Sequence, residues 1–498
     1  MNKKLTIYSI VATILLQFLT IASGFIIPKL VLTYFGSSVN GMVASVTQFL
    51  NYIQLLEGGV SAVAMAALYK PLAANDEQKV SSIVKATSSF FKTIGLIYIV
   101  YAISVALIYP AVISTPLDYY QSVLLILIIA SGIFVQYFFS LTYRVLINAD
   151  RRGYVVSLAQ CALITINLAI AILTVEIYPS IHLLKVGTLI AYLTQPLLFA
   201  IYVKKHYKIN KNVEPDKDSL KQKWDAFGHN LAYFVHANTD IIVLTIFSSL
   251  ARVSVYAVYA SITTAIRTLI IAISAAIKPS FGNVLVSSDA NHTNKVFDYY
   301  ELGINYVSSV LFSCCFILIV PFVTIYTNGI TDVNYYEPVF AILLCAGELV
   351  YCIRDPFVSA AYAANMFKKT AVFAYIETAL NIIVSLSLVY FYGLVGVAIG
   401  TLVAMVFRMV AQAIFLRNNI LFRPIQKWFK GLICVALSVV CCFCFIFFVV
   451  RITPTDYFTW FVYALISFFI SAVLTATVFF GLNSKTVIHF FKLYFLKR

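Results

Sequence analysis

Long apolar runs separated by short polar connections dominate the sequence. A helix that crosses about 30 Å of hydrocarbon needs about 20 consecutive apolar residues, and fourteen runs approach or exceed that length. They cover residues 5–27, 41–68, 93–113, 122–146, 155–177, 184–203, 231–250, 253–277, 304–326, 339–361, 371–390, 395–415, 432–450 and 460–481. The pattern predicts an all-α integral membrane protein with about 14 transmembrane helices.

Composition excludes a soluble protein. Of the 498 residues, 61% are hydrophobic and only 11% are charged, whereas an ordinary soluble domain carries roughly 25% charged residues. So few charges cannot cover a surface that faces water. A soluble enzyme is therefore excluded, and a multi-pass membrane protein surrounded by lipid is expected.

The distribution of lysine and arginine predicts the orientation in the membrane. If the N-terminus is cytoplasmic, 27 of the 35 Lys and Arg residues fall in cytoplasmic connections and termini. Only Lys29, Lys185, Arg252 and Arg451 fall on the outer side. Because cytoplasmic loops carry an excess of positive charge, both termini are expected to be cytoplasmic. The same rule explains the net charge of +15, so no nucleic-acid partner is inferred.

The two halves of the chain carry an internal repeat. Residues 31–35 (VLTYF) match residues 243–247 (VLTIF), and further pairs follow at offsets of 208–217 residues. The repeat unit is six spans, so both copies have the same orientation and the substrate path is expected between them. We expect an N-lobe over 1–203 (spans 1–6), an inter-lobe linker over 204–230, a C-lobe over 231–415 (spans 7–12), and spans 13–14 with the tail over 416–498. The Lys-rich composition of the linker is typical of a mobile cytoplasmic segment.

Ionisable residues within the apolar runs are the candidate functional residues. Each costs about 2.5–3.5 kcal/mol at mid-bilayer on insertion scales, so each is a functional candidate by default. The cations are Lys29, Arg144, Arg267, Arg354 and Arg408. The acids, which are candidates for ion coupling or gating, are Glu57, Asp240, Glu348, Asp355 and Glu377. The repeat places a cation on span one and an acid on span two, and the C-lobe reverses the signs. Unlike charges facing each other across a cavity would hold the lobes together in one access state.

Structural explanations compete with these functional ones. Asp240 and Arg267 lie on adjacent antiparallel spans, where they would neutralise each other. Arg354 and Asp355 precede a proline, and a local pair at a proline kink explains them as well as ligand contact does. Glu348 has no obvious partner in its own helix, which makes it the better candidate for a proton site.

Proximity to the membrane surface gives other residues structural explanations. Arg144 sits about four residues from the cytoplasmic end of its span, so its side chain is expected to extend to the interface. Glu377 and Arg408 lie roughly 10–14 Å from the cytoplasmic interface, for a helical rise of about 1.5 Å per residue. For these two residues the structural and the functional explanation are about even. Gly396 and Gly400 are expected to permit close helix packing.

No motif for catalysis, nucleotide binding or metal binding occurs. The nine cysteines all lie in apolar runs, without the spacing of a zinc site or a disulfide framework. No Walker-type phosphate loop is present. No cofactor or metal is expected, and the chain is not expected to be an enzyme or to hydrolyse ATP. Energy would come from an ion gradient, of H⁺ or Na⁺, or from the substrate gradient.

Four segments resemble one transporter family. They are Gly24–Lys29 (GFIIPK), Tyr34–Gly41 (YFGSSVNG), Gln54–Val60 (QLLEGGV) and Gly393–Thr401 (GLVGVAIGT). Together with the span count, they resemble the polysaccharide transporter family, the Wzx-type flippases within the MATE-like exporter (MOP) superfamily. Most of the matching positions are small or apolar.

The resemblance implies transport of a lipid-linked glycan. Members of this family move undecaprenyl-pyrophosphate-linked oligosaccharide repeat units across the bacterial cytoplasmic membrane for capsule, O-antigen or exopolysaccharide assembly. The implied mechanism is alternating access, and other polysaccharide-assembly membrane proteins are implied partners. Lys29 matches the basic residue that commonly follows the proline in span one. Arg267, Arg354 and Arg408 are further candidates for the pyrophosphate from the burial argument alone.

Three alternatives stay open. A multidrug or cation-coupled exporter of the same superfamily usually has twelve spans, so spans 13 and 14 count against it. The flippase for the peptidoglycan precursor lipid II has fourteen spans, but a denser set of arginines in its first lobe is expected. A membrane glycosyltransferase or polymerase needs a large outer loop with catalytic residues, and no connection here is long enough.

Overall fold

The computed structural model describes the backbone of residues 3–57, 59–210, 212–216, 218–220, 238–450 and 452–495. It is 88% helical, and no strand occurs among the described residues. The chain divides into two compact units, unit 1 (Met1–Ser254) and unit 2 (Val255–Arg498). This agrees with an all-α membrane protein.

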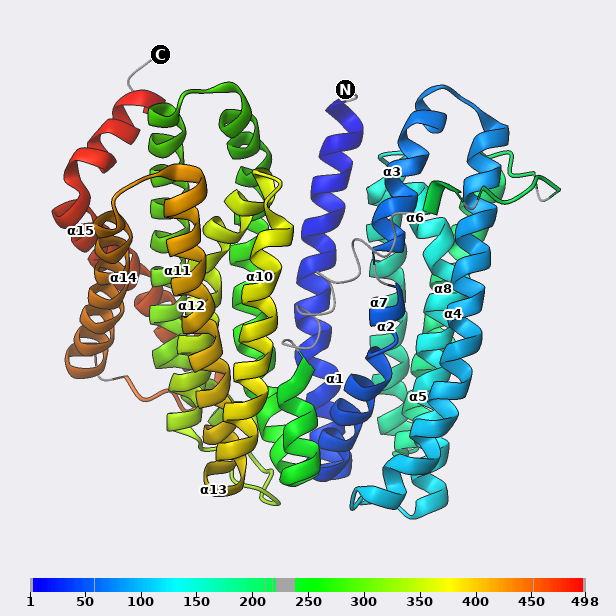
Figure 1. The fold of residues 1–498 in the computed structure, drawn as a ribbon. Coiled ribbons are helices and arrows are strands. Elements are labelled where there is room, and N and C mark those ends of the chain that lie inside the picture. The colour runs from blue at the N-terminus through cyan, green and yellow to red at the C-terminus, as the bar shows by residue number, and fades with distance from the viewer. Residues whose placement is uncertain are drawn as a thin grey trace. The chain divides into compact units, whose positions relative to one another are not determined.

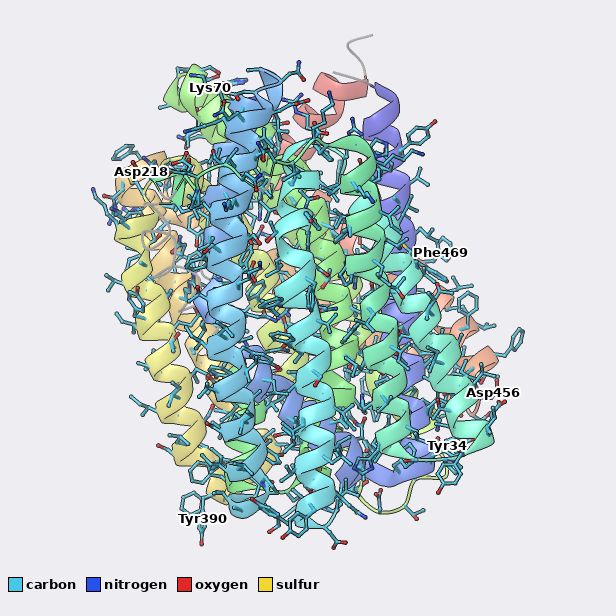
Figure 2. All side chains as sticks on the ribbon, turned by 90° about the vertical axis from the view of Figure 1, so that its right-hand side faces the viewer. Tyr34, Lys70, Asp218, Tyr390, Asp456 and Phe469 are labelled. Atoms are coloured by element: carbon cyan, nitrogen blue, oxygen red, sulfur yellow. The ribbon has the colours of Figure 1, made fainter. Side chains whose placement is uncertain are left out.

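Unit 1 is a bundle of antiparallel helices (Figure 1). Its elements are α1 (Lys3–Asn51), α2 (Gln54–Glu57), α3 (Val60–Ala73), α4 (Glu77–Val112), α5 (Tyr119–Val135), a π-helical turn (Gln136–Ser140), α6 (Leu141–Ala149), α7 (Gly153–Ile177), α8 (Ile181–His206), a 3₁₀ turn (Asp218–Leu220) and a short helix (Asn238–Phe247). Lys70 and Asp218 lie at one end of this bundle and Tyr34 lies near the other (Figure 2). The connections of unit 1 therefore alternate between its two ends.

Unit 2 begins within a long helix and contains the two C-terminal helices. Its elements are α10 (Leu250–Ser287), α11 (Ala290–Tyr326), α12 (Pro338–Ala363), α13 (Phe367–Leu416), a π-helical turn (Arg417–Leu421), α14 (Ile425–Phe445), a second π-helical turn (Ile446–Val450) and α15 (Tyr457–Phe495). Both α14 and α15 pack against α11. At one point of this contact Trp460 donates a hydrogen bond from Nε1 to the Leu318 carbonyl at 3.2 Å.

Two glycines mark sharp reversals inside α1 and α13. Gly36 has φ 82° and Gly393 has φ 52°, values that favour glycine because it has no Cβ. Around Gly393 the chain folds back on itself. A hydrogen bond of 2.8 Å from Asn381 Nδ2, before this glycine, to Thr401 Oγ1, after it, shows that the two halves of the helix lie side by side. α13 therefore supplies two membrane-crossing segments, and α1 supplies the first segment and the beginning of the second.

The described helices match 13 of the 14 predicted spans and part of span seven. Ten helices are long and apolar enough to cross a membrane. Of these, α13 contains two predicted spans, and α1 contains span one and the start of span two. Span ten is α12, and of span seven the structure describes the short helix Asn238–Phe247. Span two is interrupted between Asn51 and Val60, so it consists of the end of α1, α2 and α3.

The outer surface suits lipid. Large apolar side chains are exposed along the helices, for example Phe18 (70%), Leu96 (62%) and Phe469 (65%). In water such exposure would favour aggregation, whereas in a bilayer it is the expected lipid contact. The chain is a multi-pass membrane protein by this measure, as its composition predicts.

The first part of the predicted linker is held against unit 1. Tyr207 donates a hydrogen bond to Asp150 at 2.6 Å, and Lys85 donates to the Val213 carbonyl at 2.8 Å. Asp216 forms an ion pair of 2.8 Å with Lys79. Hydrogen bonds from Lys79 and from Ser219 lower the pKa of Asp216 to about 2. These hydrogen bonds and ion pairs connect the described part of the predicted linker to α4 and the α6–α7 connection. Residues 221–237, which end the predicted linker and begin span seven, lie outside the described residues.

Candidate functional site

The charges of α10 and α12 form two ion pairs between parallel helices. Arg267 lies 2.8 Å from Glu348, and Lys278 lies 3.1 Å from Asp355. The pairs join positions 81 and 77 residues apart, so the two helices run in the same direction. Positions 267 and 278 are three turns apart on α10 and share one face. This face meets the face of α12 that carries the two acids.

Asp355 is the centre of a polar cluster. Besides Lys278, it accepts hydrogen bonds from Ser274 and, at 3.4 Å, from Ser359. Ser274 Oγ and the Tyr300 hydroxyl lie 2.5 Å apart, which extends the cluster to α11. The cluster thus connects three helices of unit 2 through one carboxylate.

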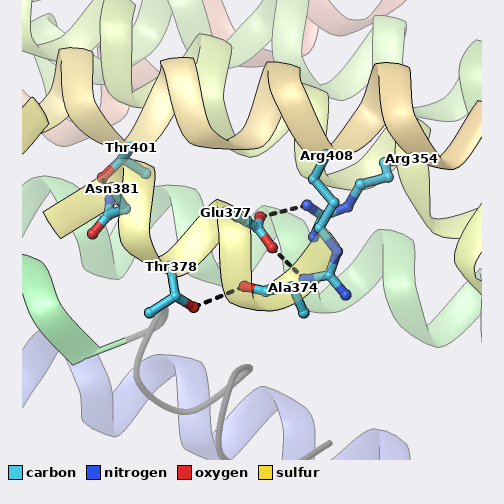
Figure 3. A network of polar contacts seen from close by, with 7 residues as sticks. All are labelled: Arg354, Ala374, Glu377, Thr378, Asn381, Thr401 and Arg408. Atoms are coloured by element: carbon cyan, nitrogen blue, oxygen red, sulfur yellow. Dashed lines mark hydrogen bonds and ion pairs between the residues drawn. The ribbon is translucent and has the colours of Figure 1, made fainter. Parts of the chain in front are cut away.

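Glu377 is shared by two arginines (Figure 3). Arg354 donates to Glu377 Oε1 at 2.6 Å, and Arg408 donates to Oε2. The Glu377 side chain is fully buried and that of Arg354 is 4% exposed. The Nε atoms of both arginines are buried and donate to no acceptor among the described residues. One carboxylate therefore balances two guanidinium groups, which leaves one excess positive charge in the interior of unit 2.

An aromatic ring links this triad to the Arg267–Glu348 pair. The Arg267 guanidinium carbon lies 5.2 Å from the centre of the Tyr351 ring, and that of Arg354 lies 4.8 Å from it. Both distances are within the range of a cation–π contact. Arg267, Glu348, Tyr351, Arg354, Glu377 and Arg408 form what we call the C-lobe charge network.

Unit 1 has a smaller polar cluster at its interrupted helix. Glu57 ends α2, and Ser61 donates to it at 2.5 Å. Arg144 of α6 interacts with Glu57 electrostatically, and so does Tyr137 of the π-helical turn. Tyr137 and Tyr351 are 214 positions apart, within the offset of the sequence repeat, and each ring neighbours an arginine. Broken helices and π-helical turns are frequent at functional sites of membrane proteins.

The structure changes the interpretation of several predicted residues. Glu348 lacks a partner in its own helix but pairs with Arg267 of α10. The prediction of a local Arg354–Asp355 pair is wrong. Arg354 pairs with Glu377, and Asp355 pairs with Lys278. Asp240 is buried within unit 1, at 5% exposure. Arg144 is exposed.

Lys29 and the glycines can also be placed. Lys29 is half-buried on α1, one residue after Pro28. A Cβ at Gly400 would lie 2.2 Å from Ser385 Oγ, and one at Gly396 would lie 2.5 Å from the Leu388 carbonyl oxygen. Close packing at both glycines is confirmed. All nine cysteines are free, and Cys444 alone among them is exposed.

Sequence reasoning missed Lys278, Ser274 and Tyr351. The apolar run ends before Lys278, which places this residue in a connection, but α10 continues to Ser287. A helical-face count would have found it, since positions 267, 274 and 278 form one stripe. For Tyr351 the sequence contains a weaker signal, its match to Tyr137 at the repeat offset.

Comparisons with known proteins identify the fold. The sequence matches no protein-family model and no curated protein. Among solved structures, "Lipid II flippase MurJ, inward closed conformation" superposes with a TM-score of 0.74 at 16% identity, over 95% of this chain and 99% of that one. An inward-facing multidrug resistance MATE transporter of the MOP superfamily superposes with a TM-score of 0.64 at 13% identity, over 82% and 98%. The chain has the fold of MOP transporters.

Coverage differs between the two kinds of neighbour. The MATE multidrug transporter DinF-BH gives a TM-score of 0.63 at 14% identity, over 85% of this chain and 97% of that one. The MurJ structure covers ten or more percentage points more of this chain than either MATE structure. The MOP fold is thus shared with both kinds of neighbour, and the MurJ structure matches the greater share of the chain.

Proposed function

We propose that the protein is a flippase that moves undecaprenyl-pyrophosphate-linked oligosaccharide repeat units across the bacterial cytoplasmic membrane by alternating access. The observation that carries the proposal is the C-lobe charge network. It keeps more guanidinium groups than carboxylates inside a bundle with the MOP fold. Burying unbalanced charge in a membrane protein costs free energy, and such charges are typical of residues that serve transport.

The chemistry of the network suits a pyrophosphate. Arginine binds phosphate oxygens through a planar pair of N–H donors, and a desolvated arginine does so more strongly than one in water. Arg267 is the most accessible arginine of the network, with 23% of its side chain exposed. In our proposal it leaves Glu348 for the pyrophosphate, while the buried triad around Glu377 keeps the local potential positive. Lys29 of unit 1 is a second proposed contact.

Release of Arg267 also gives Glu348 a role. While the pair is intact, Arg267 stabilises the ionised carboxylate, and loss of the arginine to an anionic substrate favours proton uptake by Glu348. Substrate binding and protonation would then be coupled, and an H⁺ gradient would drive the cycle. Glu57, Asp240, Asp355 and Glu377 are proposed to gate or support it, with both termini in the cytoplasm.

The decisive experiment measures lipid movement in proteoliposomes. A fluorescent undecaprenyl-pyrophosphate oligosaccharide is reconstituted with the protein, and its accessibility to an external quencher is followed with and without a proton gradient. We expect flipping by the wild type, its loss in Arg267→Ala, and loss of only the gradient stimulation in Glu348→Ala. Arg417→Ala, which removes an exposed arginine after α13, is the matched control and should flip normally.

Two substrate arms separate the alternatives. Lipid II tests whether this chain shares the substrate that its MurJ neighbour is named for, and a soluble cationic dye tests the MATE-type alternative. Transport of the dye without movement of any lipid-linked sugar would contradict the proposal. Movement of lipid II in preference to the longer oligosaccharide would contradict the assignment of repeat units as the substrate but would support the assignment as a flippase.

A further inference from the structure

A polar pocket opens between α11, α14 and α15, away from the charge network. Its volume is about 140 Å³, whereas a cavity that holds a single water has about 10–15 Å³. The pocket can therefore hold a group the size of several water molecules. Its lining residues are Asp298, Glu301, Leu302, Asn305, Arg423, Lys427, Lys430, Gly431, Phe479 and Asn483. They belong to segments predicted to lie at or near the cytoplasmic surface.

Cations outnumber acids in this pocket. Arg423 donates to Asp298 at 2.7 Å and also to Glu301, and Lys427 pairs with Asp298 at 2.6 Å. Lys430 is exposed and forms no ion pair with any residue that the structure describes. Its charge is therefore the one that the two carboxylates leave unbalanced.

The start of α14 adds to the positive potential. The residue before its first turn is Pro424, which offers no side-chain cap. The Lys427 N–H donates to the Pro424 carbonyl at 3.2 Å, so the N–H groups of Ile425 and Gln426 are the ones that no side chain caps. Lys427 and Lys430 stand on the first two turns of this 21-residue helix. The combination of helix N-terminus and lysines favours an anion.

The floor of the pocket offers hydrogen-bond acceptors. Asn305 is 3% exposed, and its Oδ1 accepts no hydrogen bond from the described residues. Glu301 lies beside it at 6% exposure. A Cβ at position 431 would approach Asn305 Nδ2 to 3.2 Å, so Gly431 keeps the floor open. A buried acceptor without a donor is costly, and a ligand hydroxyl would satisfy it.

We propose that this pocket binds the headgroup of an anionic phospholipid that carries hydroxyl groups, of the phosphatidylglycerol class. The phosphodiester lies between Lys427, Lys430 and the first turn of α14, and a headgroup hydroxyl donates to Asn305 Oδ1. A zwitterionic lipid would not balance the net positive charge. Basic pockets between helices near the cytoplasmic surface are suited to such headgroups.

The surface beyond Lys430 fits the acyl chains. Ile433, Leu437 and Val440 follow Lys430 at three- and four-residue steps and are 58%, 43% and 57% exposed. They therefore form an apolar stripe on the same face of α14. This stripe favours a membrane lipid over a soluble phosphate.

The test is lipid-dependent stabilisation of the purified full-length protein. Phosphatidylglycerol, phosphatidylethanolamine and phosphatidylcholine are titrated in detergent, and thermal unfolding reports binding. We expect phosphatidylglycerol alone to stabilise, with about fivefold weaker apparent affinity in Lys430→Gln. Lys368→Gln removes an exposed lysine from another predicted cytoplasmic connection and should leave the affinity unchanged. Equal effects of these two variants would overturn the proposal.

Two further arms test the headgroup assignment. Phosphatidic acid has no hydroxyl-bearing headgroup, so the wild type should prefer phosphatidylglycerol, and Asn305→Leu should lose that preference. The soluble headgroup glycerophosphoglycerol, at the same concentration, should not stabilise. Equal stabilisation by phosphatidylethanolamine, or by the soluble headgroup, would overturn the assignment to an anionic membrane lipid.

Discussion

Arg267 and Glu348 form a bifurcated contact between two helices, with Arg267 Nη1 at 2.8 and 3.0 Å from the two oxygens of the Glu348 carboxylate. Each residue alone is an unexplained charge inside an apolar run. As a pair they are electrically neutral, and both side chains keep some exposure, 23% and 10%. The exposure of the pair is what the proposed mechanism requires, because an anionic substrate must reach Arg267 to compete with Glu348.

A double-mutant cycle on this pair separates stability from transport. Arg267→Gln and Glu348→Gln should each lower thermal stability, because each leaves a partly buried charge without its partner. The double variant should recover a coupling energy of about 0.5–3 kcal/mol. Flipping should stay defective in the double variant because the cation for the pyrophosphate is missing. Full recovery of flipping would show that the pair serves only the fold.

Removing the shared carboxylate of the triad should have a larger effect on stability. Glu377→Gln leaves two buried arginines, Arg354 and Arg408, without a counter-charge, and breaking a buried pair in this way typically costs about 3–5 kcal/mol. We expect a strong drop in folded yield and in the temperature of unfolding in detergent. Glu176→Gln is the matched control, because Glu176 is exposed at the end of α7. Equal behaviour of the two variants would contradict the triad.

The helices were predictable because the bilayer imposes their length. A crossing segment must pair its backbone N–H and C=O groups within the helix and present about 20 apolar residues. These residues are consecutive in the sequence, so the segment can be recognised from the sequence alone. The ends of the helices are not constrained in this way, which is why α10 extends to Ser287 beyond its apolar run and includes Lys278.

The partners of the charges were not predictable by the same reasoning. Arg267 and Glu348 meet across 81 positions and Arg354 and Glu377 across 23, and hydropathy does not say which faces of two helices meet. Neighbours in sequence were therefore misleading, as with Arg354 and Asp355. The contacts of the segment after α8 were unpredictable for a related reason. Its composition is that of a mobile linker, but the residues that contact it lie far away in the sequence, 57 positions for Asp150 with Tyr207 and 129 positions for Ser81 with the Asn210 amide.

Attachment of that segment should depend on pH through Asp216. The pKa of Asp216 is lowered to about 2 when it is paired with Lys79, so the pair stabilises the attached state above about pH 4 and loses this effect as the pH falls toward 2. Protease sensitivity of residues 207–220 should be constant from pH 5 to 8 and rise below about pH 3. Chymotrypsin at neutral pH and pepsin in acid measure it.

Substitution gives the corresponding neutral-pH result. Asp216→Asn should expose the segment to chymotrypsin at pH 7, and Glu214→Gln, at an exposed neighbouring acid, should not. Because Lys79 is half-exposed, at 51%, salt should weaken the attachment in the wild type. An Asp216→Asn variant that is cleaved as slowly as the wild type would mean that the backbone hydrogen bonds suffice.

Gly400 tests the hairpin that α13 makes around Gly393. A Cβ at Gly400 would lie 2.8 Å from the backbone nitrogen of Ser385 as well as 2.2 Å from its hydroxyl oxygen, so a rotamer change cannot relieve the clash. Gly400→Ala should therefore force the two halves of α13 apart and destabilise the protein by about 1–3 kcal/mol, as overpacking does in tight cores. The same movement would lengthen the contact of Arg408 with Glu377, so flipping should fall together with thermal stability. Gly481→Ala is the matched control, because a Cβ at position 481 meets nothing within 4 Å. Normal stability in Gly400→Ala would mean that the hairpin opens at no cost, and the close packing of its two halves would then play no part in holding the triad together.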